Sequence, residues 1–166
     1  MRGAALFAAL ALLTPGAALA EAHDEADPVA EAEAQRAFLN AQQAYLSGLM
    51  AKDGWYTGEG GLKYRYVDYR GTGPSPEVSD TVTVHYAGTF IDGETFDSSF
   101  DRGQPATFPL GGLIPAWQIA IPIMHMGETI EIAAPSTIAY GPRGKGPIPG
   151  GATLLFRIEL LGIEGR

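Results

Sequence analysis

Apolar and polar residues alternate along three segments of this chain, and each segment predicts a β-strand with one buried face. The alternation covers residues 62–66, 82–86 and 154–160. A period of two places successive side chains on opposite faces of a sheet, so that one face can be apolar and the other solvated. A further strand is expected at residues 129–133. The pattern is typical of an antiparallel sheet.

Turn-forming residues separate these segments. Residues 71–76 are rich in glycine, proline and serine, which predicts a loop. Asp92 and Gly93 give a strong hairpin signal, because tight hairpin turns need positive backbone φ angles. They are expected to join strands at residues 87–91 and 94–96.

A single short helix is expected within the alternating region. Pro115 suits the first turn of a helix, and Pro122 is expected to end it after about two turns around Trp117. Successive strands with one short helix among them indicate an α+β fold. In this fold an antiparallel β-sheet would wrap around the short helix.

The segment before the sheet has helical periodicity. Asp27 followed by Pro28 predicts an N-cap and the first helical residue. Apolar residues then recur every three or four positions, and Gly54 is expected to stop the helix. The apolar stripe consists of Ala34, Phe38, Ala41, Tyr45 and Leu49. Two interpretations stay open: the stripe packs on the chain's own domain, or it forms the seam of a homodimer.

The first twenty residues have the three-part pattern of a signal peptide. Arg2 precedes an apolar run over residues 4–13, and small residues precede the cleavage expected near Ala20. About twenty apolar residues are needed to cross a bilayer, so this pattern favours a cleaved leader over a membrane anchor. The mature protein is therefore expected in a bacterial periplasm or outside the cell. The expected domains are a signal peptide at 1–20, an acidic segment and helix at 21–54, and a folded domain at 55–166.

Composition narrows the chemistry that is open to the chain. There is no cysteine, which excludes disulfides, thiol catalysis and a lipid-modified cysteine as an anchor. The formal net charge of −8 disfavours nucleic acid and anionic lipid as partners. His23, His85 and His125 lack the spacing of metal ligands. We therefore expect neither a metal nor a cofactor.

Five separated fragments carry aromatic residues with almost no nucleophile or metal-ligand cluster beside them, as in an apolar pocket. They are Val82-Thr83-Val84-His85-Tyr86-Ala87-Gly88, Phe96-Asp97-Ser98-Ser99, Ile114-Pro115-Ala116-Trp117, Ala139-Tyr140-Gly141 and Ala152-Thr153-Leu154-Leu155-Phe156. In this order and spacing they closely resemble the FKBP-type peptidyl-prolyl cis-trans isomerases. The similarity extends over residues 55–163, and it is to the exported bacterial group typified by macrophage infectivity potentiators.

The resemblance implies a role for each pocket residue. Trp117 is expected beneath the proline ring of a substrate, while the Ile114 amide and the Tyr140 hydroxyl are expected to bind substrate carbonyls. The implied catalytic residues are Tyr86, Phe96, Asp97, Ile114, Trp117 and Tyr140. The implied substrate-binding residues are Leu113, Ile148, Phe156 and Phe108, the last of them beside the pocket rather than in it.

Some of these residues have a second interpretation. From spacing alone the aromatic side chains fit plain core positions, because most buried aromatics only pack. Asp97 is the one charged group expected at the pocket wall. It could equally cap the turn at Ser98 and Ser99, or pair with Arg102.

Two features bear on ligand binding. Ala106 stands where many family members have an aromatic residue at the pocket rim, which implies a more open rim and leaves macrolide inhibitors as candidate ligands only. Residues 141–151 are rich in glycine but lack the Gly-Lys-Ser/Thr ending and following helix of a phosphate-binding loop. The resemblance implies instead a flap over the proline site, with Arg143 and Lys145 facing the substrate.

The function expected is a peptidyl-prolyl cis-trans isomerase that accelerates proline-limited folding of exported proteins. Its partners would be unfolded or partly folded polypeptides that contain proline. The alternative is a non-catalytic polypeptide-binding module or holdase chaperone, which would use the same pocket together with the N-terminal helix.

Overall fold

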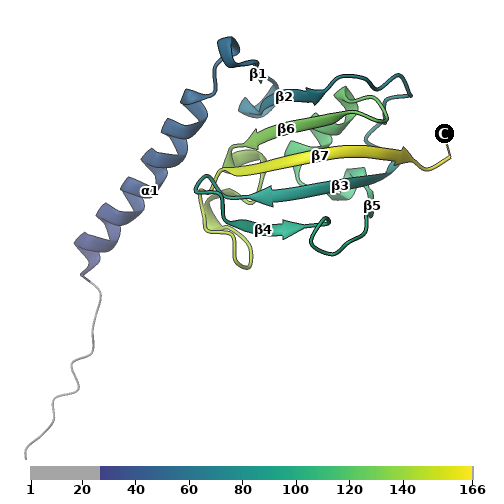
Figure 1. Ribbon diagram of the computed structural model, residues 1–166. Coiled ribbons are helices and arrows are strands. Elements are labelled where there is room, and N and C mark those ends of the chain that lie inside the picture. Colours follow the sequence, from purple (N-terminus) through teal and green to yellow (C-terminus); the bar gives the residue numbers. More distant parts are fainter. Residues whose placement is uncertain (1–26, 166) are drawn as a thin grey trace, which may run out of the picture.

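The computed structural model describes residues 27–165, in which helix α1 precedes a sheet of seven strands and a second helix, α2 (Figure 1). The helices are α1 (Pro28–Gly48) and α2 (Pro115–Ala120). The strands are β1 (Tyr56–Thr57), β2 (Lys63–Asp68), β3 (Thr81–Thr89), β4 (Thr95–Ser98), β5 (Ala106–Pro109), β6 (Thr129–Ala134) and β7 (Leu154–Ile163). The predicted signal peptide, its cleavage near Ala20 and residues 21–26 lie outside the described residues.

The strands form one antiparallel sheet. Within residues 27–165 their order is β1-β2-β6-β7-β3-β4, and β5 pairs with β3. Buried and partly exposed residues alternate along β3, as the sequence pattern predicts, and Val82 and Val84 are completely buried. The predicted antiparallel α+β fold is confirmed.

Helix α2 supplies the other side of the core. Ile114 has an extended backbone and Pro115 occupies the first turn, so the chain enters the helix abruptly. The buried residues of α2 are Ala116, Trp117 and Ala120, and they pack against side chains from the inner face of the sheet. In Figure 1 the green helical segments lie behind the strands. The sheet and α2 thus enclose one apolar core.

Helix α1 begins as predicted but ends earlier. The Asp27 carboxylate accepts a hydrogen bond of 2.9 Å from the Val29 N–H, which caps the helix. The last helical residue is Gly48, not a residue just before Gly54, and Leu49 already has an extended backbone. Glycine has poor helix propensity, which favours the earlier end. Gly54, with a φ of 83°, instead closes a separate short turn.

The second half of α1 packs on the sheet domain. Gln42 is only 6% exposed, and its Oε1 accepts a hydrogen bond of 2.8 Å from the Thr153 N–H. Phe38 contacts the core, whereas residues 27–37 are all exposed. Figure 1 shows this N-terminal half of α1 leading away from the sheet. Packing on the chain's own domain therefore occurs, and the homodimer stays a prediction.

Two local expectations were wrong. The bounds of the strands joined at Asp92 and Gly93 differ from those predicted: β3 ends at Thr89 rather than at residue 91, and β4 begins at Thr95 and extends to Ser98. The pairing register shifts between Gly88 and Thr89, and Thr89 with Thr95 is the last pair before the turn. Strand β5 was not expected at all. No helix among the described residues is long and apolar enough to cross a membrane.

Candidate active site

A cavity of about 290 Å³ opens between the inner face of the sheet, α2 and the loop over residues 141–151. Strands β3, β4, β5 and β7 each contribute a side chain, so residues far apart in sequence meet there. The lining residues are Tyr86, Phe96, Asp97, Phe108, Gly112, Leu113, Ile114, Trp117, Tyr140, Lys145 and Phe156. The sheet topology, rather than any single motif, builds this cavity.

Aromatic side chains form the cavity floor. Trp117 is 4% exposed, and its ring meets those of Tyr86 and Phe156 edge to face, with centroids 5.1 and 5.4 Å apart. Phe96 meets Phe156 in the same geometry at 5.7 Å. Such edge-to-face contacts hold aromatic rings in fixed orientations. The floor is therefore rigid and apolar.

Two further features of the floor are the lack of a side chain at Gly88 and the unpaired indole N–H of Trp117. A Cβ atom at Gly88 would lie 2.6 Å from Phe96 Cζ, so only glycine leaves room for the Phe96 ring at this point of β3. The Trp117 Nε1–H is buried and has no hydrogen-bond partner within the described chain. An unpaired buried N–H is costly. The floor thus keeps its apolar character at some expense of stability.

A polar group made of Tyr86, Asp97 and Arg102 closes one wall. The Tyr86 hydroxyl donates a hydrogen bond of 2.5 Å to Asp97 Oδ2, and Arg102 forms an ion pair with Asp97 Oδ1. Arg102 Nη2 also donates to the Tyr86 hydroxyl at 3.0 Å. Asp97 therefore pairs with Arg102, as one of its three interpretations expected, and it also lines the cavity.

The surroundings fix the protonation states of this group. Burial raises the pKa of Tyr86, and its hydrogen bond to Asp97 raises it further. Burial alone would raise the pKa of Asp97, but hydrogen bonds from Tyr86 and Arg102 outweigh that effect and lower it. At neutral pH Tyr86 is neutral and Asp97 is a paired anion. A carboxylate with a lowered pKa is a poor general base.

Two further hydrogen-bond donors line the cavity, the Ile114 N–H and the Tyr140 hydroxyl. The Ile114 C=O accepts from the Trp117 N–H at 3.0 Å, whereas the Ile114 N–H has no partner within residues 27–165. Tyr140 lies at the start of the loop over residues 141–151, and the Lys145 ammonium is 5.7 Å from the centre of its ring. Both the free amide and the phenol can reach a ligand in the cavity.

The structure brings together all of the sequence-predicted site residues except one, and Phe108, which was expected beside the pocket, lines the cavity itself. Ile148 does not line the cavity: it is 8% exposed and packs in the core, while its backbone pairs with Lys145 through two hydrogen bonds of 3.0 Å. Lys145 lines the cavity, but Arg143 does not. Gly112 and the glycine requirement at Gly88 were missed, because only the folded chain shows which rings approach them.

The arrangement suits binding of an apolar group more than bond-breaking chemistry. The cavity lining contains no serine, cysteine or histidine. Among the described residues no group of three or more histidine, cysteine, aspartate or glutamate side chains could hold a metal. The cavity therefore offers an aromatic floor, the hydroxyl groups of Tyr86 and Tyr140, and the free backbone amide of Ile114.

Comparison with known proteins gives a consistent result. The chain is 47% identical over 122 residues to FkpA, an FKBP-type peptidyl-prolyl cis-trans isomerase of Aeromonas hydrophila, covering 74% of this chain and 45% of that protein. It is 43% identical over 147 residues to the FKBP-type 22 kDa peptidyl-prolyl cis-trans isomerase of Escherichia coli, covering 88% of this chain and 70% of that protein.

A solved structure agrees with the sequence matches. The crystal structure of FkpA from Escherichia coli superposes with a TM-score of 0.74 at 36% identity, covering 81% of this chain and 64% of that one. The chain thus spans about half the length of the Aeromonas relative. The family model described as FKBP-type peptidyl-prolyl cis-trans isomerase matches residues 73–161, which contain the whole cavity lining. The chain therefore belongs to the family of FKBP-type peptidyl-prolyl cis-trans isomerases.

Proposed function

We propose that this chain catalyses cis-trans isomerisation of Xaa-Pro peptide bonds in exported polypeptides and so accelerates their proline-limited folding. The observation that carries the proposal is the aromatic cavity above Trp117, whose only carboxylate is held in a hydrogen-bonded pair. Family membership supports the same activity. The export part rests on the signal-peptide pattern of the first twenty residues.

The chemistry requires no covalent intermediate. Rotation about the peptide bond is opposed by the loss of amide resonance, with a barrier of about 18–20 kcal/mol. The twisted amide is less charge-separated than either planar isomer. A water-poor apolar cavity therefore favours the twisted state, and an enzyme accelerates a step by binding its transition state better than its ground state.

Each side chain then has a defined task. The indole of Trp117 would support the proline ring, while Phe96, Phe108, Leu113 and Phe156 would exclude water around it. The Ile114 N–H and the Tyr140 hydroxyl would hold the carbonyls that flank the rotating bond. Tyr86 and Asp97 would hold the cavity wall beside the amide in one geometry and one protonation state.

A protease-coupled assay on four-residue Xaa-Pro peptides tests the proposal. The wild-type chain should isomerise these peptides, and Trp117→Ala should abolish turnover. Lack of turnover by a folded wild-type chain would instead favour the alternative, a binding module or holdase. That alternative draws on the exposed N-terminal half of α1, residues 27–37, and predicts suppression of client aggregation without isomerisation.

The location and the inhibitors of the protein can be tested separately. N-terminal sequencing of fractionated protein should recover a mature chain that starts near Glu21 in the exported compartment. Macrolides of the type that FKBP proteins bind should compete for the cavity. Ala106 lies on β5 next to Thr107 and Phe108 and does not itself line the cavity, so we expect weaker competition than for relatives with an aromatic at this position.

A further inference from the structure

A second cavity lies between α1, the β3–β4 hairpin and the loop over residues 141–151. Its volume is about 420 Å³, and we call it the α1 cavity. Its apolar walls are Phe38 from α1, Phe90 and Phe96 from the hairpin, and Pro147 and Pro149 from the loop. No residue of the active-site floor other than Phe96 contributes to it. The α1 cavity is thus separate from the proline site but adjacent to it.

A row of aromatic rings connects the two cavities. Phe96 lines both of them. Centroid distances are 5.4 Å from Trp117 to Phe156, 5.7 Å from Phe156 to Phe96 and 5.0 Å from Phe96 to Phe90. The Trp117 and Phe90 rings therefore lie within about 16 Å of each other, a span that about five residues of extended chain cover.

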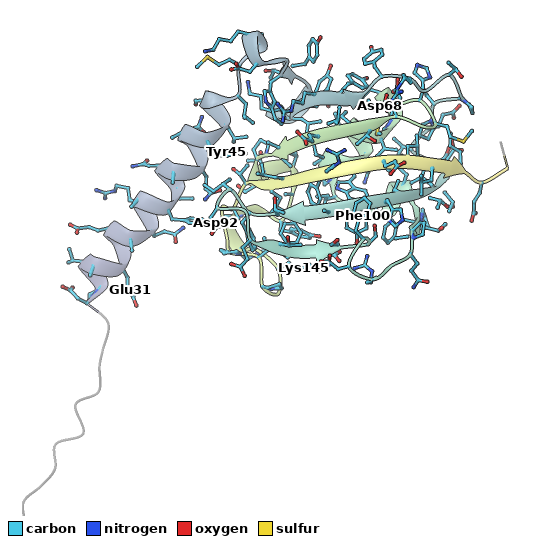
Figure 2. All side chains as sticks on the ribbon, viewed as in Figure 1. Glu31, Tyr45, Asp68, Asp92, Phe100 and Lys145 are labelled. Atoms are coloured by element: carbon cyan, nitrogen blue, oxygen red, sulfur yellow. The ribbon has the colours of Figure 1, made fainter. Side chains whose placement is uncertain are left out.

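The rim of the α1 cavity is acidic. Asp92 and Glu94 line it, both are exposed, and neither forms an ion pair within the described residues. No lysine or arginine lines this cavity, whereas Lys145 lines the proline site. Figure 2 shows Asp92 at the end of the hairpin on the side of α1, and Lys145 on the loop below the strands. The α1 cavity therefore has an acidic rim, whereas the proline site is lined by both Asp97 and Lys145.

We propose that the α1 cavity is a second binding site for the client polypeptide, taking an apolar side chain with an adjacent lysine or arginine about five residues from the proline. The occupant is the same chain whose proline lies over Trp117, because the two cavities share Phe96 and the Trp117 and Phe90 rings lie within about 16 Å of each other. The inference therefore rests on the proposed function. It gives α1 a direct role in choosing clients.

The anchoring of α1 supports this role. Without α1 the cavity would lose the wall that Phe38 and Gln42 provide. Gln42 holds the helix in place through its bond to the buried Thr153 N–H. The side chain of Leu39 fills the space beside Gly151, where a Cβ atom would lie 2.4 Å from Leu39 Cδ2. The helix and the loop are therefore fitted to each other around the cavity.

Binding of labelled peptides tests the inference. Each peptide carries one proline and a Phe-Lys pair five residues before or after it, and a matched set carries Phe-Glu. Fluorescence anisotropy at low salt should give a Kd about fivefold lower for Phe-Lys than for Phe-Glu in the favoured direction, a size typical of exposed ion pairs. Salt of 0.5 M should remove most of this preference without any mutation.

The variant to compare is Asp92→Asn combined with Glu94→Gln. Asp92 Oδ1 accepts a hydrogen bond of 3.0 Å from the Glu94 N–H, and asparagine keeps that acceptor, so the hairpin should persist. This double variant should bind Phe-Lys and Phe-Glu peptides equally. Glu164→Gln, an exposed acidic residue outside both cavities, is the matched control and should keep the preference.

The results separate this inference from the proposed function. Equal Kd values for Phe-Lys and Phe-Glu in both directions, or a preference that the double variant retains, would overturn the inference. Turnover of four-residue peptides, which are too short to reach the α1 cavity, reports on the proline site alone. If short peptides are not turned over but the preference persists and depends on Asp92 and Glu94, the proposed isomerase function fails and the binding site stands.

Discussion

Replacement of Asp97 gives the sharpest test of how the cavity wall is held. In the Asp97→Ala variant, the Tyr86 hydroxyl loses the acceptor that lies 2.5 Å away, although Tyr86 is only 5% exposed. A buried donor without an acceptor costs about 1–3 kcal/mol. Arg102 also loses its ion-pair partner, but its side chain is 45% exposed and water replaces the carboxylate. We therefore expect a loss of about 1–3 kcal/mol in the free energy of unfolding, nearly all of it from Tyr86.

Tyr86→Phe separates the two contributions. This variant removes the donor hydroxyl itself, so no buried hydroxyl is left unpaired. Asp97 keeps its pairing with Arg102. It should cost about 0.5–1.5 kcal/mol, the usual net value of one hydrogen bond. The double variant with Asp97→Ala should be less destabilised than the sum of the single variants, because the two residues share one interaction. Urea denaturation at pH 7 measures all four proteins.

The pH dependence fixes the sign of the effect. Because the pKa of Asp97 is lowered in the folded chain, its stabilising contribution is present above the unfolded value of about 3.9. It is lost as pH falls through the lower folded pKa. The difference in stability between wild type and Asp97→Asn should therefore be constant from pH 5 to 8 and shrink below about pH 4. A difference that persists unchanged at pH 2.5, or additive single and double variants, would refute this account.

Three further outcomes follow from the same contacts. Trp117→Ala should lower the free energy of unfolding by about 3–5 kcal/mol and abolish turnover. Trp117→Phe, which removes the unpaired Nε1–H, should stay folded by circular dichroism and lose mainly affinity for proline peptides. Gln42→Leu leaves the buried Thr153 N–H without an acceptor. It should lower the free energy of unfolding by about 1–3 kcal/mol and speed hydrogen exchange at Thr153. The control Gln43→Leu, at an exposed neighbouring position, should change neither the stability nor the exchange rate. The pKa of Tyr86 is raised and that of Asp97 is lowered, so neither group titrates between about pH 5 and 9. We therefore expect kcat/KM to be flat across that range. A bell-shaped profile would contradict catalysis without proton transfer.

Elements set by local physics could be predicted from the sequence. Alternation along β3 and β7 places Val82 and Leu154 inside because a strand turns successive side chains to opposite faces. Asp27 and Pro28 start α1 because a side-chain acceptor and a fixed φ act within one turn. These signals need no knowledge of the partner segments.

Elements set by pairing could not be predicted in the same way. Strand β5 is four residues long and ends in proline, and it becomes a strand only because β3 pairs with it from Thr81 to Val84. The end of α1 was misjudged because Gly54 looked like a helix stop, whereas Gly48 is the last helical residue. Packing of α1 on the domain was one of two interpretations of its apolar stripe, but the role of Gln42 could not be predicted, because its buried side chain is polar and lies outside that stripe.

The candidate site shows the same division. Trp117, Tyr86 and Phe156 could be proposed from the order and spacing of the motifs that carry them. The exclusion of Ile148 could not, because it depends on a backbone pairing with Lys145 inside the loop. Neither could the contact of Gly88 with the Phe96 ring, which requires two strands to be in register. Resemblance transfers the residue types of a site, whereas packing decides which of them reach the cavity.

The pairing of Asp97 has a consequence for how such a cavity can favour a twisted amide. A planar amide carries partial positive charge on nitrogen, so a free carboxylate beside it would stabilise the planar ground state and raise the barrier. Arg102 and the Tyr86 hydroxyl occupy both oxygens of Asp97 and reduce its field at the substrate. The wall can then hold Tyr86 in place through polar contacts and yet exert only a weak electrostatic field on the proline. Because only stabilisation that is larger in the transition state accelerates the reaction, the paired carboxylate is better suited to catalysis than a free one.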